Sequence, residues 1–149
     1  MRKNRMNLTV IVKKPKEFID QTTIESFVEF LFKKSGENSE KELNIVLVDD
    51  DEITKLNEQF KNRKGPTNVL SFYGYDGDIL GDIAISSDTI EREALEKKEN
   101  AKEYLLFIIA HGFLHLVGYT HETMDKFDEM MKKQKELVDE FLKEGVVNG

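Results

Sequence analysis

An apolar segment late in the chain restricts the fold more than any other feature of the sequence. Residues 104–117 have the composition of a helix but almost no polar face, so they predict a helix that is buried on most of its surface. Such a helix must be covered on several sides by other elements. The chain has 149 residues, and at this length a single core can bury roughly two thirds of the unfolded chain's surface. The segment is also shorter than the roughly 20 residues of a bilayer span, so we expect no membrane-spanning helix.

The remaining segments predict a sheet and several further helices. Runs rich in β-branched residues predict strands at Leu8–Val12, Glu42–Val48, residues 68–72 and Ile79–Ser86. Spacing and capping residues predict helices that begin near Thr22, at Asp49 to Asp51, at Ser87 and near residue 123. No linker or repeat divides the chain. We therefore expect one α+β domain over residues 1–149, with about four strands in a mixed sheet and four to five helices.

Apolar spacing also predicts which side chains lie in the core. One set belongs to the helix after Ser87 and consists of Ile90, Ala94 and Leu95. A second set forms the stripe of the last helix and consists of Phe127, Met131, Val138 and Phe141. Phe72, Tyr73 and Tyr75 could stack on bases, but aromatic residues of strands more often belong to the core.

Charge and cysteine content exclude several classes of protein. The chain carries 22 basic and 29 acidic residues, a net charge of -7, which argues against broad electrostatic attachment to nucleic acid or to anionic membranes. The absence of cysteine excludes a thiol nucleophile, an iron–sulfur cluster and a cysteine zinc ribbon. The apolar run behind the basic residues 1–5 is too short for a signal peptide. We therefore expect a cytoplasmic protein that binds neither DNA nor a membrane.

All three histidines of the chain lie in one short string, HGFLHLVGYTH. His111 and His115 are one helical turn apart, so their imidazoles project from the same face and can bind one ion. Gly118 allows a sharp turn that brings back His121 as a third ligand. Three neutral imidazoles leave a fourth position open, as catalytic zinc sites do. The spacing predicts one Zn²⁺ per chain on these histidines, carried by a zincin-like helix.

The same string lacks the catalytic base of zinc peptidases. Metzincin peptidases carry H-E-x-x-H-x-x-G-x-x-H. This sequence matches that motif at all three histidines and, with Gly118, at its glycine. Gly112 stands in the place of the glutamate, and glycine has no group that can take a proton from water. A chemistry that uses a metal hydroxide directly, or that takes its base from elsewhere, fits better than peptide hydrolysis.

The histidine string, with LNEQFKNRKGPTNVLSF and LGDIAIS upstream, resembles the YbeY family of bacterial endoribonucleases that act in ribosomal RNA maturation. The resemblance covers about residues 47–131, with the segments in the same order and spacing. It implies a small sheet beside buried helices, zinc on the three histidines, and single-stranded RNA as substrate, notably near the 3′ end of the small-subunit (16S) ribosomal RNA. Residues 1–149 would then be a single catalytic domain whose partner is ribosomal RNA or the small ribosomal subunit.

The chain departs from the family's pattern at two positions. Lys61 follows Phe60 where the family usually has an arginine that is thought to serve the active site. A lysine keeps the positive charge but loses the planar fork that grips two phosphate oxygens. Thr120 replaces an aspartate that could orient a metal ligand.

The loop of residues 61–67, KNRKGPT, concentrates positive charge in this acidic chain. Lys61 is the candidate catalytic cation, and Arg63 and Lys64 are candidates for binding the phosphates of a substrate. The ordinary alternative is a solvated run of charges without a function.

Three functions remain open at this point. The first is a metal-dependent, single-strand-specific endoribonuclease in ribosomal RNA maturation. The second is a zinc-dependent hydrolase of peptides or small substrates with a metzincin-type site, and the third is a ribosome-associated binding protein whose metal is structural. Gly112 weighs against the second, and the open coordination position weighs against the third.

Overall fold

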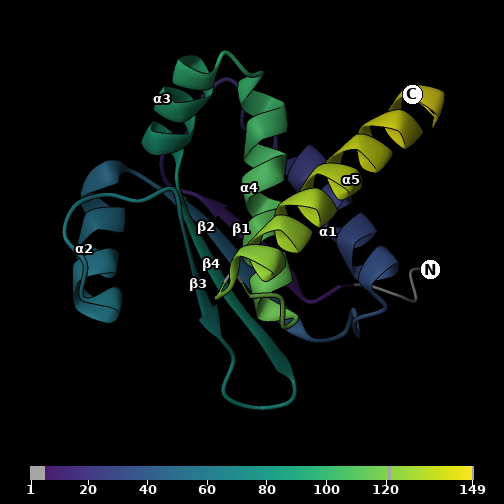
Figure 1. Ribbon diagram of the computed structural model, residues 1–149, viewed down its shortest axis with the longest axis horizontal. Helices are drawn as coiled ribbons and strands as arrows, with labels where there is room; N and C mark the ends of the chain where they lie inside the picture. The colour runs from purple at the N-terminus through teal and green to yellow at the C-terminus, as the bar shows by residue number, and fades with distance from the viewer. Residues whose placement is uncertain (1–5, 121, 149) are drawn as a thin grey trace.

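The computed structural model describes residues 6–120 and 122–148, which form four strands and five helices (Figure 1). In chain order these are β1 (Leu8–Val12), α1 (Gln21–Ser35), β2 (Glu42–Val48), α2 (Asp50–Lys61), β3 (Val69–Tyr73), β4 (Ile79–Ser86), α3 (Ser87–Lys97), α4 (Ala101–Leu116) and α5 (Met124–Asn148). The predicted α+β class is confirmed. The apolar helix begins three residues earlier than the sequence indicates, at Ala101, because Asn100 caps it by accepting from the backbone N–H of Glu103.

The four strands form one mixed sheet in the order β1-β2-β4-β3. β1 pairs with β2 and β2 with β4 in parallel, whereas β3 runs antiparallel to β4 and forms an edge of the sheet. Helix α2 lies on one side of the sheet, and α1, α4 and α5 lie on the other (Figure 1). Helix α4 contacts β3 and β4 of the sheet as well as α1, α3 and α5.

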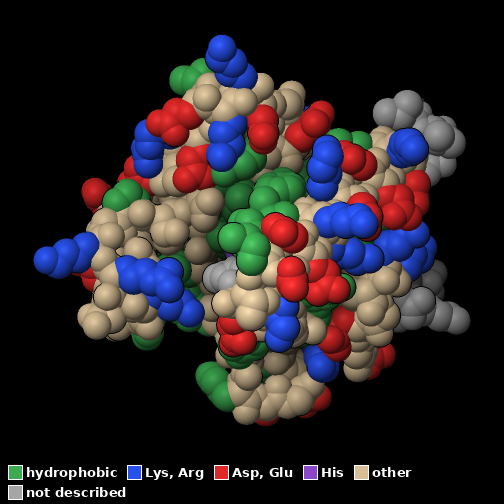
Figure 2. All heavy atoms as spheres, in the orientation of Figure 1, with side chains coloured by type: hydrophobic (Ala, Val, Ile, Leu, Met, Phe, Trp, Pro, Cys, Tyr) green, Lys and Arg blue, Asp and Glu red, His purple; other side chains and the backbone are tan. Residues whose placement is uncertain are grey.

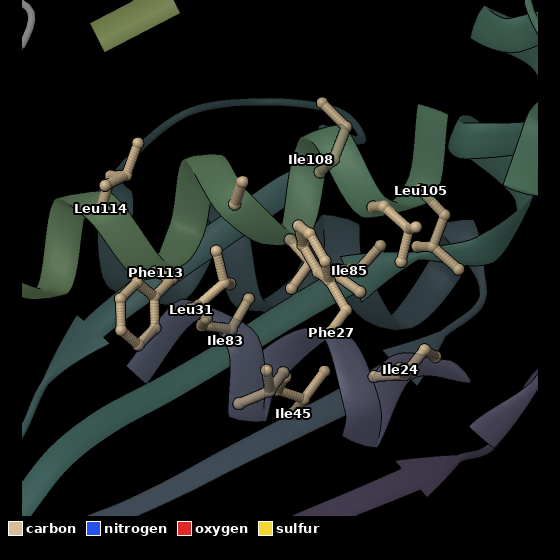
Figure 3. Packing of buried hydrophobic residues seen from close by; sticks show 14 of the residues in the cluster. Ile24, Phe27, Leu31, Ile45, Ile83, Ile85, Leu105, Ile108, Phe113 and Leu114 are labelled. Carbon is tan, nitrogen blue, oxygen red and sulfur yellow. The ribbon is translucent and has the colours of Figure 1, made fainter. Parts of the chain in front are cut away.

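The core explains why the apolar helix needs so much cover. Ten residues of α4 are buried, and they pack against α1, the sheet and α5 together. In Figure 3, Phe113 of α4 lies near Leu31 of α1 and Ile83 of β4 within one cluster. Phe113 also meets Phe32 edge-to-face, with ring centroids 5.2 Å apart. A second, smaller cluster under α2 includes Val48, Ile53, Leu70 and Ala84.

Helix starts show where capping patterns mislead. Asp49 caps α2 by accepting from the Glu52 N–H, as expected. The prediction that Thr22 caps the first helix is wrong: Asp20 accepts from the Thr22 N–H, so the helix starts before Thr22. Ser86, not Ser87, caps α3, because β4 runs directly into that helix and its last side chain reaches the Thr89 N–H.

Several residues predicted in the core lie at the surface. Leu95 is 79% exposed, although Ile90 and Ala94 beside it are buried as expected. Tyr73 and Tyr75 are 64% and 94% exposed because they lie at the end of an edge strand and in the turn that follows it. In the stripe of α5, Val138 is buried, whereas Phe127 is 42% exposed. Over the described ranges, no helix combines the length and the apolar character needed to cross a membrane.

Candidate active site

Helix α4 presents two of the three histidines. His111 and His115 are half-buried on one face, and their ring centroids lie 4.8 Å apart with the planes nearly perpendicular. The helix that carries them is held from three directions, so the backbone that positions the two imidazoles is rigid. The predicted placement of these two residues on one helical face is confirmed. His121, the third predicted ligand, lies outside the described residues.

Gly112, between the two histidines, lies where α4 crosses the sheet. A Cβ at this position would approach Ile83 Cγ2 to 3.0 Å and the Ser71 Oγ to 3.2 Å. The Ser71 hydroxyl donates to the Gly112 carbonyl at 3.2 Å, which ties β3 to the histidine helix. The position that holds the glutamate base in peptidases therefore faces packed protein.

Gln134 of α5 contacts His111, the first histidine of α4. Its side chain is 1% exposed, and its Oε1 lies 3.0 Å from Nδ1 of His111. The same amide donates through Nε2 to the Phe107 carbonyl at 3.2 Å. Both hydrogen-bonding ends of a buried polar side chain are thus used at the site.

A cavity of about 740 Å³ adjoins His111 and is open to one face of the molecule. Figure 2 shows hydrophobic side chains over α4 on this face, with Lys and Arg side chains over α2 to the left and along α5 to the right. The apolar lining residues include Tyr104, Phe107, Phe127 and Met131. Phe127 and Met131 therefore line a cavity beside a histidine, which corrects the expectation that the whole α5 stripe lies in the core.

A tyrosine at the wall of this cavity is held as a hydrogen-bond donor. The Tyr104 hydroxyl donates to Glu93 Oε1 at 2.6 Å, and the Asn68 amide donates to the same oxygen at 3.1 Å. Burial raises the pKa of Tyr104 well above its ordinary value, and the adjacent Glu93 carboxylate raises it further. The phenol therefore stays protonated and links α3, α4 and the start of β3.

The Lys61 side chain contacts β3, the strand at the edge of the sheet. Its Nζ donates to the Ser71 carbonyl at 3.3 Å and lies 5.1 Å from the centroid of the Phe72 ring. Because Ser71 also bonds Gly112, two contacts connect the Lys61 ammonium to the histidine helix. Lys61 is the last residue of α2 rather than part of the loop.

The other two predicted cations are exposed and uncommitted. Arg63 and Lys64 are solvent-exposed, and their side chains make no hydrogen bond or ion pair with any residue that the structure describes. The structure thus brings Lys61 toward the histidine helix and leaves Arg63 and Lys64 on the loop beyond it.

The loop itself is held by a buried asparagine. Asn57 is 3% exposed, and its Nδ2 donates to the Gly65 carbonyl at 3.0 Å. Gly65 has a φ of +83°, a left-handed conformation that favours glycine. The backbone carbonyl of Asn57 also accepts from the backbone N–H of Arg63 at 3.3 Å, so Asn57 determines the path of the cationic loop.

Sequence reasoning did not single out Ser71, Asn57 or Gln134. Ser71 and Asn57 stand inside the segments quoted for the family resemblance, so their place in those segments was a signal. Gln134 had a weaker one: it interrupts an apolar stripe, and buried glutamines are uncommon without a specific partner.

Donor chemistry at the site suits a metal such as zinc. Imidazole nitrogen is a preferred zinc ligand, and a ligating imidazole ordinarily donates its other N–H to an oxygen, as the His111 ring can to Gln134. Thr120, beside the third predicted ligand, has a buried hydroxyl with no hydrogen-bond partner among the described residues. Within residues 6–120 and 122–148 no three His, Cys, Asp or Glu side chains are placed so that they could hold a metal ion together.

The fold and the site define a single-domain α+β protein with a histidine pair on a buried helix, to which Ser71 connects Lys61. A family model described as "Endoribonuclease YbeY" matches residues 9–142. The chain therefore belongs to the YbeY endoribonuclease family.

Individual relatives agree with this assignment. Endoribonuclease YbeY of Bacillus subtilis is 34% identical over 131 residues, covering 79% of this chain and 83% of the relative. The protein of the same name from Aquifex aeolicus is 39% identical over 139 residues, covering 89% of each chain. The solution structure of TM1509 from Thermotoga maritima superposes with a TM-score of 0.67 at 32% identity, covering 95% of this chain and 93% of that one.

Proposed function

We propose that this protein is a metal-dependent endoribonuclease that cleaves single-stranded RNA during ribosomal RNA maturation, near the 3′ end of the 16S RNA. Family membership supports the reaction class. The observation that carries the site assignment is the histidine pair of α4, whose rings lie 4.8 Å apart and which connects through Gly112 and Ser71 to the Lys61 ammonium. The expected setting is the cytoplasm, with the small ribosomal subunit as partner.

The residues that would hold one Zn²⁺ are His111, His115 and His121. When bound, such an ion polarises a phosphate oxygen and makes water more acidic. The helix contributes preorganisation, because its packing fixes the backbone that carries the two imidazoles before any ligand arrives. Gln134 contributes the orientation of one ring.

Cations of this chain would neutralise the phosphate. Of the three predicted cations, Lys61 is the one connected to the histidine helix through Ser71, so it suits a contact to the non-bridging oxygens of the phosphate that is cleaved, where charge develops. Arg63 and Lys64, exposed and without partners among the described residues, suit neighbouring phosphates. Together they would position a strand along the β3 edge.

Exposed aromatics along the same edge favour an unpaired strand. Phe60 is 58% exposed and packs edge-to-face on Phe72, and Tyr73 is 64% exposed. Bases of single-stranded RNA stack on such rings, whereas paired bases are inaccessible. An acidic protein with a short cationic loop also fits a few phosphate contacts better than a long duplex footprint.

Purified protein tests this proposal directly. We expect one zinc per chain by elemental analysis, cleavage of a single-stranded RNA with the 16S 3′-end sequence, loss of cleavage with a chelator and recovery on adding zinc. His115→Ala should lose metal and activity, whereas Lys55→Ala, an exposed change on α2, should lose neither. Unimpaired cleavage after complete metal removal would refute the metal dependence.

Peptide hydrolysis is the second candidate, and the structure weighs against it. A glutamate at position 112 would point into packed protein against Ile83, so the missing base is not simply restored by substitution. Robust proteolysis by the unmodified protein, without RNA cleavage under any metal, would reverse this order. A stoichiometric metal that neither reaction needs would favour the ribosome-associated binding protein.

A further inference from the structure

Gln134 is the only buried polar side chain among the described residues of α5. Burying an amide is unfavourable unless both its donor and its acceptor are satisfied. Here each end has one partner, and both partners belong to α4: the Phe107 carbonyl and the His111 ring. The contact with His111 spans 23 positions of sequence, so only the packing of α5 on α4 creates it.

The Phe107 carbonyl determines the orientation of the Gln134 amide. A backbone carbonyl can only accept a hydrogen bond, so the group 3.2 Å from the Phe107 oxygen must be the NH₂ of Gln134. The reverse orientation would bring two oxygens together and leave the NH₂ facing the imidazole. The amide oxygen therefore faces Nδ1 of His111, at 3.0 Å.

The orientation of the amide in turn decides the state of the ring. The amide oxygen has no proton to give, so Nδ1 of His111 must be the donor of this hydrogen bond. A neutral imidazole carries one proton, and with that proton on Nδ1 the lone pair is on Nε2.

We propose that Gln134 is a positioning residue that selects the Nδ1–H tautomer of His111 and thereby makes Nε2 the nitrogen that binds metal. The inference rests on the proposed function in taking His111 as a ligand. It extends that function by assigning the ligand atom of His111 and the residue that determines which atom this is. Gln134 would not contact the metal itself and would act only through the His111 ring.

The tautomer is measurable without metal or RNA. In the metal-free protein at mildly alkaline pH, where the ring is neutral, ¹⁵N chemical shifts of His111 should report a protonated Nδ1 and an unprotonated Nε2. Gln134→Met keeps a similar volume but removes the acceptor, and we expect the Nε2–H tautomer to become populated. Gln134→Glu keeps an oxygen facing Nδ1, so it should retain the Nδ1–H form, although its second oxygen meets the Phe107 carbonyl and should lower the stability of the protein. Leu137→Met, an equally buried change on α5 that does not involve His111, should leave the shifts unchanged.

Zinc affinity gives the second readout. Loss of a hydrogen bond that orients a ligand typically weakens metal binding by about 10- to 100-fold, so Gln134→Met should lower the zinc affinity by that factor and Leu137→Met should not. A protonated Nε2 in the wild type would overturn the proposal. So would a Gln134→Met variant that keeps the Nδ1–H form and binds zinc as tightly as the wild type, since Gln134 would then serve packing alone.

The two hypotheses fail in different ways. If the protein binds zinc through His111 but cleaves no RNA, the proposed function is wrong and the role of Gln134 stands. If RNA is cleaved in a zinc-dependent way while the tautomer is unaffected by Gln134→Met, the role of Gln134 is wrong and the proposed function stands.

Discussion

Replacing Gly112 by alanine and by glutamate tests whether α4 rests directly on the sheet. Alanine favours a helix interior by about 1 kcal/mol over glycine, so an unobstructed site would be stabilised. Here the new Cβ would lie 3.0 Å from Ile83 Cγ2 and 3.1 Å from its Cδ1, and Ile83 is fully buried in the central part of the sheet. Overpacking a core usually costs about 1–3 kcal/mol.

Packing should outweigh propensity at this position. We expect Gly112→Ala to lower the free energy of unfolding by about 1 kcal/mol, which for a domain of this size shifts the melting temperature by roughly 2–4 °C. Gly112→Glu adds a carboxylate that would have to pack against the fully buried Ile83 side chain. An uncompensated buried charge costs about 3–5 kcal/mol, a large part of an ordinary total stability of about 5–15 kcal/mol.

Urea unfolding followed by far-UV circular dichroism measures both effects. Gly77→Ala is the matched control, because a Cβ on that exposed hairpin glycine meets nothing within 4 Å. A Gly112→Glu variant as stable as the wild type, or a Gly112→Ala variant more stable than it, would refute the close packing of α4 on β4.

Three further predictions concern the cationic loop and the start of α2. Lys61→Ala should lower turnover by on the order of 100-fold with little loss of RNA affinity, whereas Arg63→Ala should mainly weaken RNA binding. Lys61→Arg should preserve or raise activity. Unchanged single-turnover cleavage in both alanine variants would leave the loop without a role. Asn57→Ala should lower stability by about 1 kcal/mol and reduce RNA cleavage by releasing the loop, measured by urea unfolding and by activity under folded conditions. Burial alone would raise the pKa of Asp50, but hydrogen bonds from Thr89, Ser86 and Arg92 outweigh it and lower that pKa. The stabilisation is therefore present at neutral pH and lost as pH falls through the lowered pKa, so the stability gap between wild type and Asp50→Asn should narrow in acid; a gap independent of pH would contradict this.

Local patterns of the sequence were sufficient for most of the fold. The strands at Leu8–Val12, Glu42–Val48 and Ile79–Ser86 match their predicted bounds, because alternation and β-branching act within a few residues. The spacing of His111 and His115 determined that both share a helical face for the same reason. Capping was less reliable, because Asp20 accepts from the Thr22 N–H and Ser86 from the Thr89 N–H, so each helix is capped ahead of the residue that the pattern indicates.

Contacts between distant segments decided the rest, and no local pattern specifies them. Whether Gly112 faces solvent or the sheet depends on how α4 is rotated over β4, and that rotation is set by burying its apolar surface against three elements at once. The bond between Gln134 and His111 requires α5 to pack on α4 in one register. Lys61 approaches the histidine helix only because α2 and β3 meet at Ser71. The sequence thus indicated which side chains are candidates for the chemistry, while the tertiary structure decided which of them are held together, because orientation in a packed core is a property of all its neighbours.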